Sequence, residues 1–196
     1  MSIEIYPLTP DLADDYARFF DVTPHDVDHG EMKCYCVTWR DDKSYKDAGH
    51  WFETREERRA KAIEYVKNGN IRGYLAYDGD EIIGWCNSNE NCSLCRDYLR
   101  GYYPIEHEPS YVKIKPIFCF VVKPEYQRTG VATALVCRVC EDAAKDGFDF
   151  VEAYENECFI SASEDFRGPI KMYENCGFVK TGSSDGRAVM RKRLKE

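Results

Sequence analysis

The feature that most constrains the fold is a succession of strand, loop, helix and strand over residues 114–154. Ile114–Val122 is a nearly continuous apolar run, which is typical of a strand buried on both faces of a sheet. After a loop that begins at Lys123–Pro124, apolar residues recur at helical spacing, and Phe148–Tyr154 follows as a second strand. The helical residues are Ala132, Leu135, Val136, Val139, Cys140 and Ala143. This spacing predicts a right-handed crossover between two parallel strands.

Weaker patterns predict further elements before this crossover. Ile3–Tyr6 alternates like a short strand, and Leu12–Phe20 carries apolar residues at helical spacing. Thr54–Lys67 is expected to form an exposed helix that ends at the following Asn-Gly-Asn. The Asp78–Gly79 pair between two apolar runs predicts a hairpin of strands 73–77 and 81–86. The long segments between these elements are expected to be irregular.

The end of the chain predicts a short helix and a closing hairpin. Pro169–Asn175 suits a helix that begins with proline, and Gly177 suits its left-handed end. Strands 178–180 and 188–194 would pair through the Asp185–Gly186 turn. Together the patterns predict a single α/β domain over residues 1–196, with a mixed, mostly antiparallel sheet and helices on both faces.

Composition limits the partners of this domain. With 27 Lys and Arg against 35 Asp and Glu, the net charge is -8, and no polycationic arm is present, so nucleic acid is not an expected partner. The start of the chain has no apolar core of a secretion signal. The longest uncharged apolar run, Pro116–Val122, is far shorter than the roughly 20 residues of a spanning helix. We expect a cytoplasmic protein, monomeric or homodimeric, that does not bind membranes.

The ten cysteines are expected to be reduced thiols, because no secretion signal is evident. Four of them form two close pairs, Cys34 with Cys36 and Cys92 with Cys95. A tetrathiolate zinc site would require both pairs to meet in space. Buried free thiols are the other interpretation, and we expect no bound metal.

Residues 121–132 (VVKPEYQRTGVA) lead from the buried strand directly into the helix and can hold phosphate groups. The backbone N–H groups of Arg128, Gly130, Val131 and Ala132 would point into one concavity at the helix N-terminus, where the helix dipole favours an anion. Gly130 and the small Ala132 would let the backbone approach the phosphate oxygens.

At these residues the chain resembles the GCN5-related N-acetyltransferase (GNAT) family. Gln127-Arg-Thr-Gly-Val-Ala132 is similar to its coenzyme A loop, Gln/Arg-x-x-Gly-x-Gly/Ala, and Tyr173-Glu-Asn-Cys-Gly-Phe178 to its second motif, Tyr-x-x-x-Gly-Phe. Only residues 21–53 and 87–112 fall outside the resemblance. It implies splayed central parallel strands and acetyl-CoA as co-substrate. The residues implied to bind it are Gln127, Arg128, Thr129, Gly130, Val131 and Ala132.

The resemblance also implies how the chemistry is divided among residues. The pantetheine arm of coenzyme A would fill the gap between the splayed strands, and Val121 and Val122 would supply backbone groups, with one N–H facing the thioester oxygen. Tyr173 matches the tyrosine that protonates the departing sulfur. A tyrosine pKa near ~10 exceeds the ~8.5 of a thiol, so this residue is present as the acid at neutral pH.

The general base is left open by these motifs. Some family members carry a glutamate at the position of Pro116, and some carry an asparagine at that of Phe166. Glu152 on the next strand is the first candidate for the base. The others are a water chain to solvent and three residues before the central strand, Glu106, His107 and Glu108. An acyl-cysteine is not expected, because no basic neighbour is evident beside Cys34 or Cys36, Cys119 lies within a strand, and the resemblance implies direct transfer.

Acceptor recognition is expected from the first helices, their connection and the loop after the hairpin. Trp39, Trp85 and Asn87 lie there among acidic residues, which suits a cationic amine through cation–π contacts. The predicted function is direct acetyl transfer, in a ternary complex, from acetyl-CoA to a primary amine of a small molecule or peptide. The alternative is a non-catalytic acyl-CoA-binding protein or cysteine–metal sensor on the same scaffold.

Overall fold

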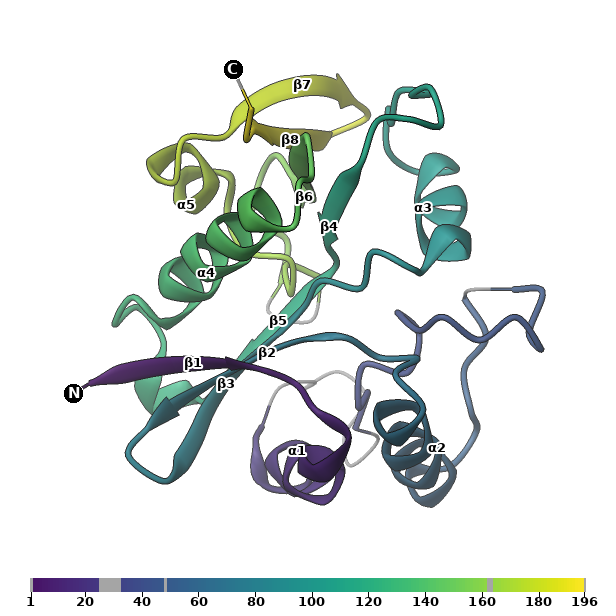
Figure 1. Cartoon of the computed structure of the whole chain (residues 1–196), viewed down its shortest axis with the longest axis vertical. Coiled ribbons are helices and arrows are strands. Elements are labelled where there is room, and N and C mark those ends of the chain that lie inside the picture. Colours follow the sequence, from purple (N-terminus) through teal and green to yellow (C-terminus); the bar gives the residue numbers. More distant parts are fainter. Residues whose placement is uncertain (1, 25–32, 48, 162–163, 196) are drawn as a thin grey trace.

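A computed structural model describes residues 2–24, 33–47, 49–161 and 164–195 (Figure 1). Its strands are β1 (Ile3–Pro7), β2 (Gly73–Asp78), β3 (Glu81–Asn87), β4 (Ile114–Ile117), β5 (Cys119–Val122), β6 (Phe150–Asn156), β7 (Val179–Ser184) and β8 (Arg187–Arg193). Its helices are α1 (Ala13–Val22), α2 (Arg55–Lys67), α3 (Ser93–Arg100), α4 (Val131–Lys145) and α5 (Ile170–Asn175), with 3-10 turns at Pro10–Leu12 and Pro124–Tyr126. None of these helices is both long and apolar enough to cross a membrane.

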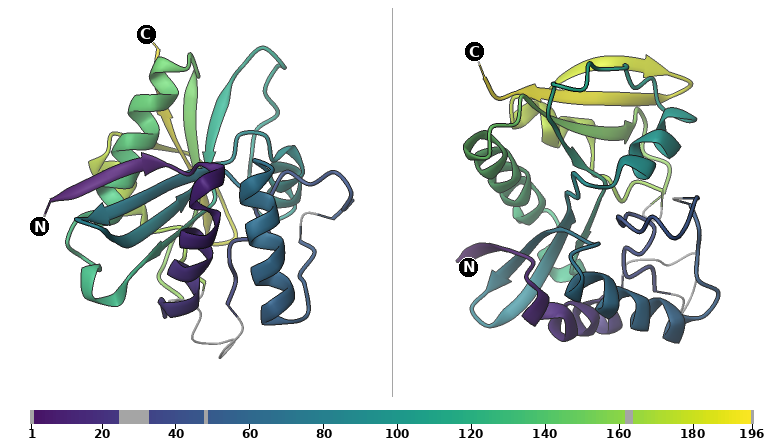
Figure 2. Two further views of the ribbon diagram at one scale, coloured as in Figure 1. Left: turned by 60° about the horizontal axis from the view of Figure 1, so that its bottom comes forward. Right: turned by 45° about the vertical axis from the view of Figure 1, so that its right-hand side comes forward.

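The predicted parallel crossover and the splay of its strands are both confirmed. β4 pairs in parallel with β6 from Ile114–Phe150 to Ile117–Ala153. The apolar run then breaks at Phe118, because β5 leaves β6 and pairs antiparallel with β3. The strands therefore form two half-sheets, in the orders β1-β2-β3-β5 and β4-β6-β8-β7, which are continuous through β4 and β5 (Figure 2).

Helices cover both faces, as predicted. α1 and α2 pack together below the first half-sheet (Figure 1). Trp85, Leu75 and Tyr16 share one apolar core there. α4 lies on the other face and contacts β1, β2, β3, β5 and β6. Its apolar stripe is buried, from Val131 to Ala143, together with residues of both half-sheets. α4 therefore links the two half-sheets and begins directly after β5.

Most local predictions hold, with one missed helix. The Thr54 hydroxyl accepts a hydrogen bond from the Glu57 N–H and caps α2. Asp78–Gly79 and Asp185–Gly186 form the two predicted hairpin turns. The segment predicted to be irregular after β3 contains α3, which buries only Cys95 and Leu99. The sequence does contain a helical pattern here, since apolar residues recur at i, i+1, i+4 and i+5, but it is only about two turns long; these residues are Leu94, Cys95, Tyr98 and Leu99.

Candidate active site

The turn between β5 and α4 presents several backbone N–H groups that have no acceptor. Arg128 and Gly130 have left-handed φ angles of 62° and 98°. Among the described residues, no group accepts a hydrogen bond from the backbone N–H of Arg128, Gly130, Val131 or Ala132. The first backbone bond of the helix is donated by the Ala134 N–H to the Gly130 carbonyl, at 2.9 Å. A Cβ built on Gly130 meets no atom within 4 Å. The turn is therefore open at the positive end of α4 and suits an anion.

The two polar side chains of this turn hold its shape. The Gln127 side-chain amide donates to the Val122 carbonyl at 3.3 Å, and the Thr129 hydroxyl donates to the Tyr126 carbonyl at 2.7 Å. Both side chains thus bond to the turn's own backbone. The anion-binding capacity of the turn comes from its N–H groups.

Alternate backbone groups of β5 face the gap between the half-sheets. The Lys123 N–H bonds to a carbonyl of β3 at 3.0 Å, whereas the Phe120 N–H bonds to the Phe166 carbonyl at 2.7 Å. Because N–H groups alternate in direction along an extended strand, that of Val121 faces β3 and that of Val122 faces the gap. Val122 thus lies where the resemblance implied. The second gap-facing residue is Phe120, and Val121 does not fit that role.

Tyr173 is fully buried on α5, and its hydroxyl donates to the Arg167 carbonyl at 2.8 Å. Burial, and next the nearby Glu155 carboxylate, raise the pKa of Tyr173 well above its ordinary value, so the phenol holds its proton. The adjacent carbonyls of Phe166 and Arg167 thus accept from two groups near the gap, the Phe120 N–H and the Tyr173 hydroxyl.

Glu155 was not among the predicted site residues. Its side chain is buried, with 1% exposed, and neither carboxyl oxygen has a hydrogen-bond partner in the described parts of the chain. Burial raises the pKa of this carboxyl well above its ordinary value, against the influence of Arg167 and Tyr173. Glu155 follows Val151 and Ala153 on the apolar face of β6. The sequence alone could have indicated this residue, because a glutamate stands at a position where the alternation of the strand predicts a buried apolar side chain.

Glu152 does not suit the role of general base that the sequence suggested. Its carboxylate is fully buried and accepts hydrogen bonds from Arg96 at 2.9 Å, from the Tyr154 hydroxyl at 2.7 Å and from Arg191. Arg191 also pairs with Glu108. Two guanidinium groups and a phenol therefore hold Glu152 in a structural network, and the same network includes the alternative candidate Glu108.

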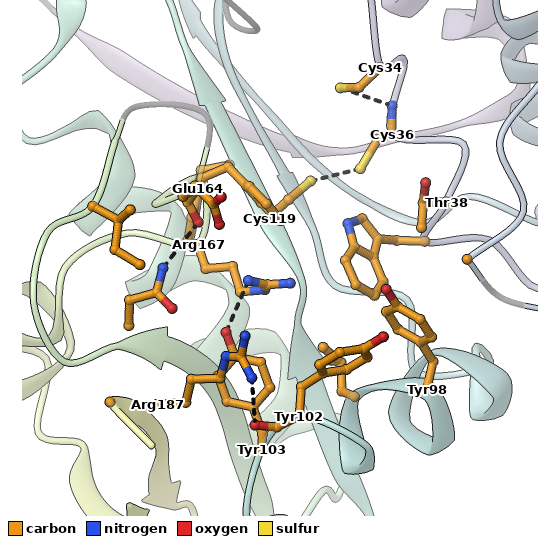
Figure 3. Close-up of a pocket in the computed structure, with 18 of the residues that line it drawn as sticks. Cys34, Cys36, Thr38, Tyr98, Tyr102, Tyr103, Cys119, Glu164, Arg167 and Arg187 are labelled. Carbon is orange, nitrogen blue, oxygen red and sulfur yellow. Dashed lines mark hydrogen bonds between the residues drawn. The ribbon is translucent and has the colours of Figure 1, made fainter. Parts of the chain in front are cut away.

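A cavity of about 690 Å³ opens beside β5. It lies between β5, the connection from α1 to α2, α3, the loop after β6 and the β7–β8 turn, and Figure 3 shows the side chains that line it. Trp39, which was predicted to contact the acceptor, lines this cavity and stacks on Phe118 at 5.2 Å between ring centroids. Trp85 and Asn87 are wrong as contact residues, because both are fully buried outside the cavity lining. The Asn87 amide instead donates to the Trp39 carbonyl at 3.0 Å and supports that residue.

The cysteine pairs do not meet. Cys36 contacts Cys119, with 2.7 Å between the sulfur atoms, while Cys92 and Cys95 form a disulfide. This differs from the expectation of reduced thiols, and the 5.3 Å between the two Cα atoms lies within the range that a disulfide requires. Within the described residues, no three His, Cys, Asp or Glu side chains are placed to share a metal ion.

Cys119 lines the cavity on β5 but is not an activated nucleophile. Burial raises the pKa of its thiol well above the ordinary value, and neighbouring cysteines act in the same direction. The thiolate form, which would attack a thioester, is therefore disfavoured.

Comparisons with known proteins agree with this geometry. Residues 25–178 match the acetyltransferase (GNAT) family. No curated protein matches the chain in sequence.

The fold is shared with solved structures that the chain matches over nearly its whole length. A candidate GNAT acetyltransferase from Desulfovibrio desulfuricans is 13% identical, with a TM-score of 0.57 over 99% of this chain and 100% of that one. The PaiA N-acetyltransferase of Thermoplasma acidophilum, solved with coenzyme A, is 16% identical, with a TM-score of 0.56 over 98% and 99%. A candidate acetyltransferase from Salmonella typhimurium, solved with acetyl-CoA, is 15% identical, with a TM-score of 0.53 over 100% and 96%. The family match spans most of the chain, and the chain therefore belongs to the GNAT acetyltransferase family.

Proposed function

We propose that this protein transfers an acetyl group from acetyl-CoA directly to a primary amine of a small molecule or peptide. The observation that carries the proposal is the set of unpaired N–H groups at Arg128, Gly130, Val131 and Ala132, at the positive end of α4 and beside the gap. A pyrophosphate would supply the hydrogen-bond acceptors that these N–H groups are without, and its negative charge suits the positive end of the helix. Two structural neighbours were solved with coenzyme A or acetyl-CoA, which supports the same ligand here.

The thioester end of the co-substrate would lie along β5. The gap-facing N–H groups of Phe120 and Val122 would donate to carbonyl oxygens of the acyl and pantetheine groups. At Phe120 the ligand would replace the bond to the Phe166 carbonyl. A donor held in this position stabilises the oxyanion that develops when an amine attacks the thioester.

Tyr173 would supply the proton that the departing thiolate requires. Its raised pKa keeps the phenol protonated, and its hydroxyl lies in the same region as the Phe120 N–H, since both bond to adjacent carbonyls. Of the predicted candidates for the base, Glu152 and Glu108 are ion-paired, and Glu106 and His107 are not among the residues that line the cavity. The amine is therefore proposed to enter from the cavity as the free base. After the attack its nitrogen loses a further proton to solvent, and Tyr173 regains from solvent the proton that it gave to the thiolate.

The test is release of coenzyme A thiol from acetyl-CoA in the presence of a panel of primary amines. With an amine that supports turnover, Tyr173→Phe is expected to lower kcat by about 10²- to 10⁴-fold, the usual contribution of a general acid. The matched control is Tyr111→Phe, at a tyrosine that is 79% exposed, and it should leave kcat unchanged.

One result would contradict the role of Tyr173, and another would contradict the transferase function. Undiminished turnover by a folded Tyr173→Phe variant would remove this residue from the chemistry. Binding of acetyl-CoA without thiol release for any amine would instead favour a non-catalytic acyl-CoA-binding protein.

A further inference from the structure

Two arginines in the cavity face the same aromatic ring. The guanidinium carbons of Arg167, in the loop before α5, and Arg187, at the start of β8, lie 5.4 and 5.8 Å from the centre of the Tyr103 ring. Arg167 donates to the Tyr103 hydroxyl at 3.1 Å, and Arg187 makes only a long contact of 3.5 Å with the Tyr102 carbonyl. Figure 3 shows both guanidinium groups in the same part of the cavity. Two like charges at one place favour binding of an anion between or beside them.

The protein supplies no carboxylate to this pair. Within the described ranges, no Asp or Glu oxygen lies within 4.0 Å of Arg167 or Arg187, and the buried Nε of Arg167 has no acceptor. Glu155 acts on Arg167 only from beyond ion-pair distance. Arg191, on the same strand as Arg187, is by contrast paired with two carboxylates, and Glu157 on the cavity wall is paired with a lysine. Glu164 and Asp185 also line the cavity, but neither is among the residues that form an ion pair with Arg167 or Arg187 in the described parts of the chain.

Most of the aromatic rings that line the cavity already face a guanidinium group, although no such contact is found at Tyr98 among the described residues. The Arg167 guanidinium carbon lies 4.3 Å from the Phe166 ring centre and 5.5 Å from that of Trp39. At these two rings the cation–π position is filled by the protein's own guanidinium, which would also repel a second cation nearby. This revises the expectation of an acidic pocket for a cationic amine. The cavity favours an anionic group on an apolar body.

We propose that the acceptor carries a carboxylate as well as its amine, and that it is an α-amino acid with an apolar or aromatic side chain. This inference rests on the proposed transferase function. The carboxylate would accept hydrogen bonds from Arg167 and Arg187, since guanidinium groups bind carboxylates with two parallel bonds. The aromatic walls would hold the side chain, and the amine would face β5, where Cys119–Val121 line the same cavity.

The experiment compares matched pairs of substrates that differ only in the carboxylate. L-phenylalanine is paired with 2-phenylethylamine, and L-leucine with 3-methylbutylamine, and thiol release from acetyl-CoA gives kcat/KM for each. The wild-type protein is expected to use the amino acid of a pair at least about tenfold better. Arg187→Gln is expected to lower kcat/KM for the amino acid by about 10- to 100-fold, the effect of losing one charged hydrogen-bond pair, and to change that of the simple amine by less than about threefold. Arg193→Gln, at the exposed far end of β8, is the control and should change neither.

Equal use of both members of each pair, or an equal loss for both in Arg187→Gln, would overturn the proposal. A binding measurement tests the carboxylate site separately from the transferase function. Trp39 and Trp51 line the cavity, so titration with L-phenylalanine and L-leucine is followed by the change in tryptophan fluorescence. If amino acid binds to the wild type and not to Arg187→Gln while no amine releases thiol, the carboxylate site stands and the transferase fails. If neither amino acid binds while other amines release thiol, the transferase stands and the carboxylate site fails.

Discussion

At the scale of single residues, Glu152 and Glu155 lie on the same strand but on opposite faces, and only the Glu152 carboxylate is paired. Burial raises the folded-state pKa of Glu155 well above 4.5, so the folded protein keeps a proton that the unfolded chain releases above about pH 4.5. The unfolded state then binds fewer protons, and this residue makes stability fall as pH rises from about 4.5 towards the raised pKa.

Glu155→Gln is therefore expected to raise Tm at pH 7, with a gain that shrinks towards zero near pH 4, where the glutamate is protonated in both states. Thermal unfolding at pH 4, 5, 6 and 7 measures this difference. Glu152→Gln, on the other face of β6, should instead lower Tm at pH 7, because it removes charge from between two arginines. A gain for Glu155→Gln that is the same at pH 4 and pH 7 would show that its carboxyl is not the titrating group.

Residue roles were predictable where they depend on local geometry. The open N–H groups around Gly130 follow from a strand, a left-handed turn and a helix start that are contiguous in sequence. The role of Glu152 was not predictable, because its partners Arg96 and Arg191 lie 56 and 39 residues away in the chain. Asn87 and Trp85 failed as contact residues for a similar reason, since which face of β3 borders the cavity depends on the packing of distant loops.

At the scale of elements, the function proposed here depends on how α4 begins. Gly130 has a φ of 98°, a conformation that costs a residue with a Cβ about 1–2 kcal/mol of conformational energy. A substituted turn can lower that energy only by changing its backbone angles, which moves the N–H groups. Gly130→Ala is expected to weaken coenzyme A binding by about tenfold or more, as measured by calorimetric titration. Gly79→Ala is the matched control, because Gly79 also has a positive φ of 60° and space for a Cβ but lies in the β2–β3 turn. Similar weakening by both variants would mean that the loss is one of general stability.

Element types were predictable where the apolar period is long, and their ends were not. The apolar stripe of α4 was enough to predict that helix and the crossover that contains it. The single strand predicted over residues 114–122 is instead two strands, β4 and β5. The sequence contains no break there, because the run changes partners from β6 to β3 while staying buried. The splay that creates the gap is thus a property of strand pairing and was expected only through the family resemblance.

At the scale of the whole molecule, the two half-sheets raise the question of whether they unfold separately. Two features join them: β4 and β5 are successive parts of one buried run, and α4 packs on strands of both half-sheets. Opening either half would expose apolar side chains of α4, so the two halves cannot lose structure independently without a large cost in buried apolar area. We therefore propose that residues 1–196 behave as one cooperative domain.

Urea denaturation provides the test. All three tryptophans, Trp39, Trp51 and Trp85, precede β4, so their fluorescence reports the first half-sheet and its helices, whereas far-ultraviolet circular dichroism reports the whole chain. The two probes are expected to give a single transition with the same midpoint. Saturating coenzyme A should move both midpoints upward together, because its proposed site at the end of β5 and the start of α4 belongs to the shared unit. A midpoint that shifts for one probe only would show that the half-sheets are separate domains and that the cofactor loop belongs to one of them.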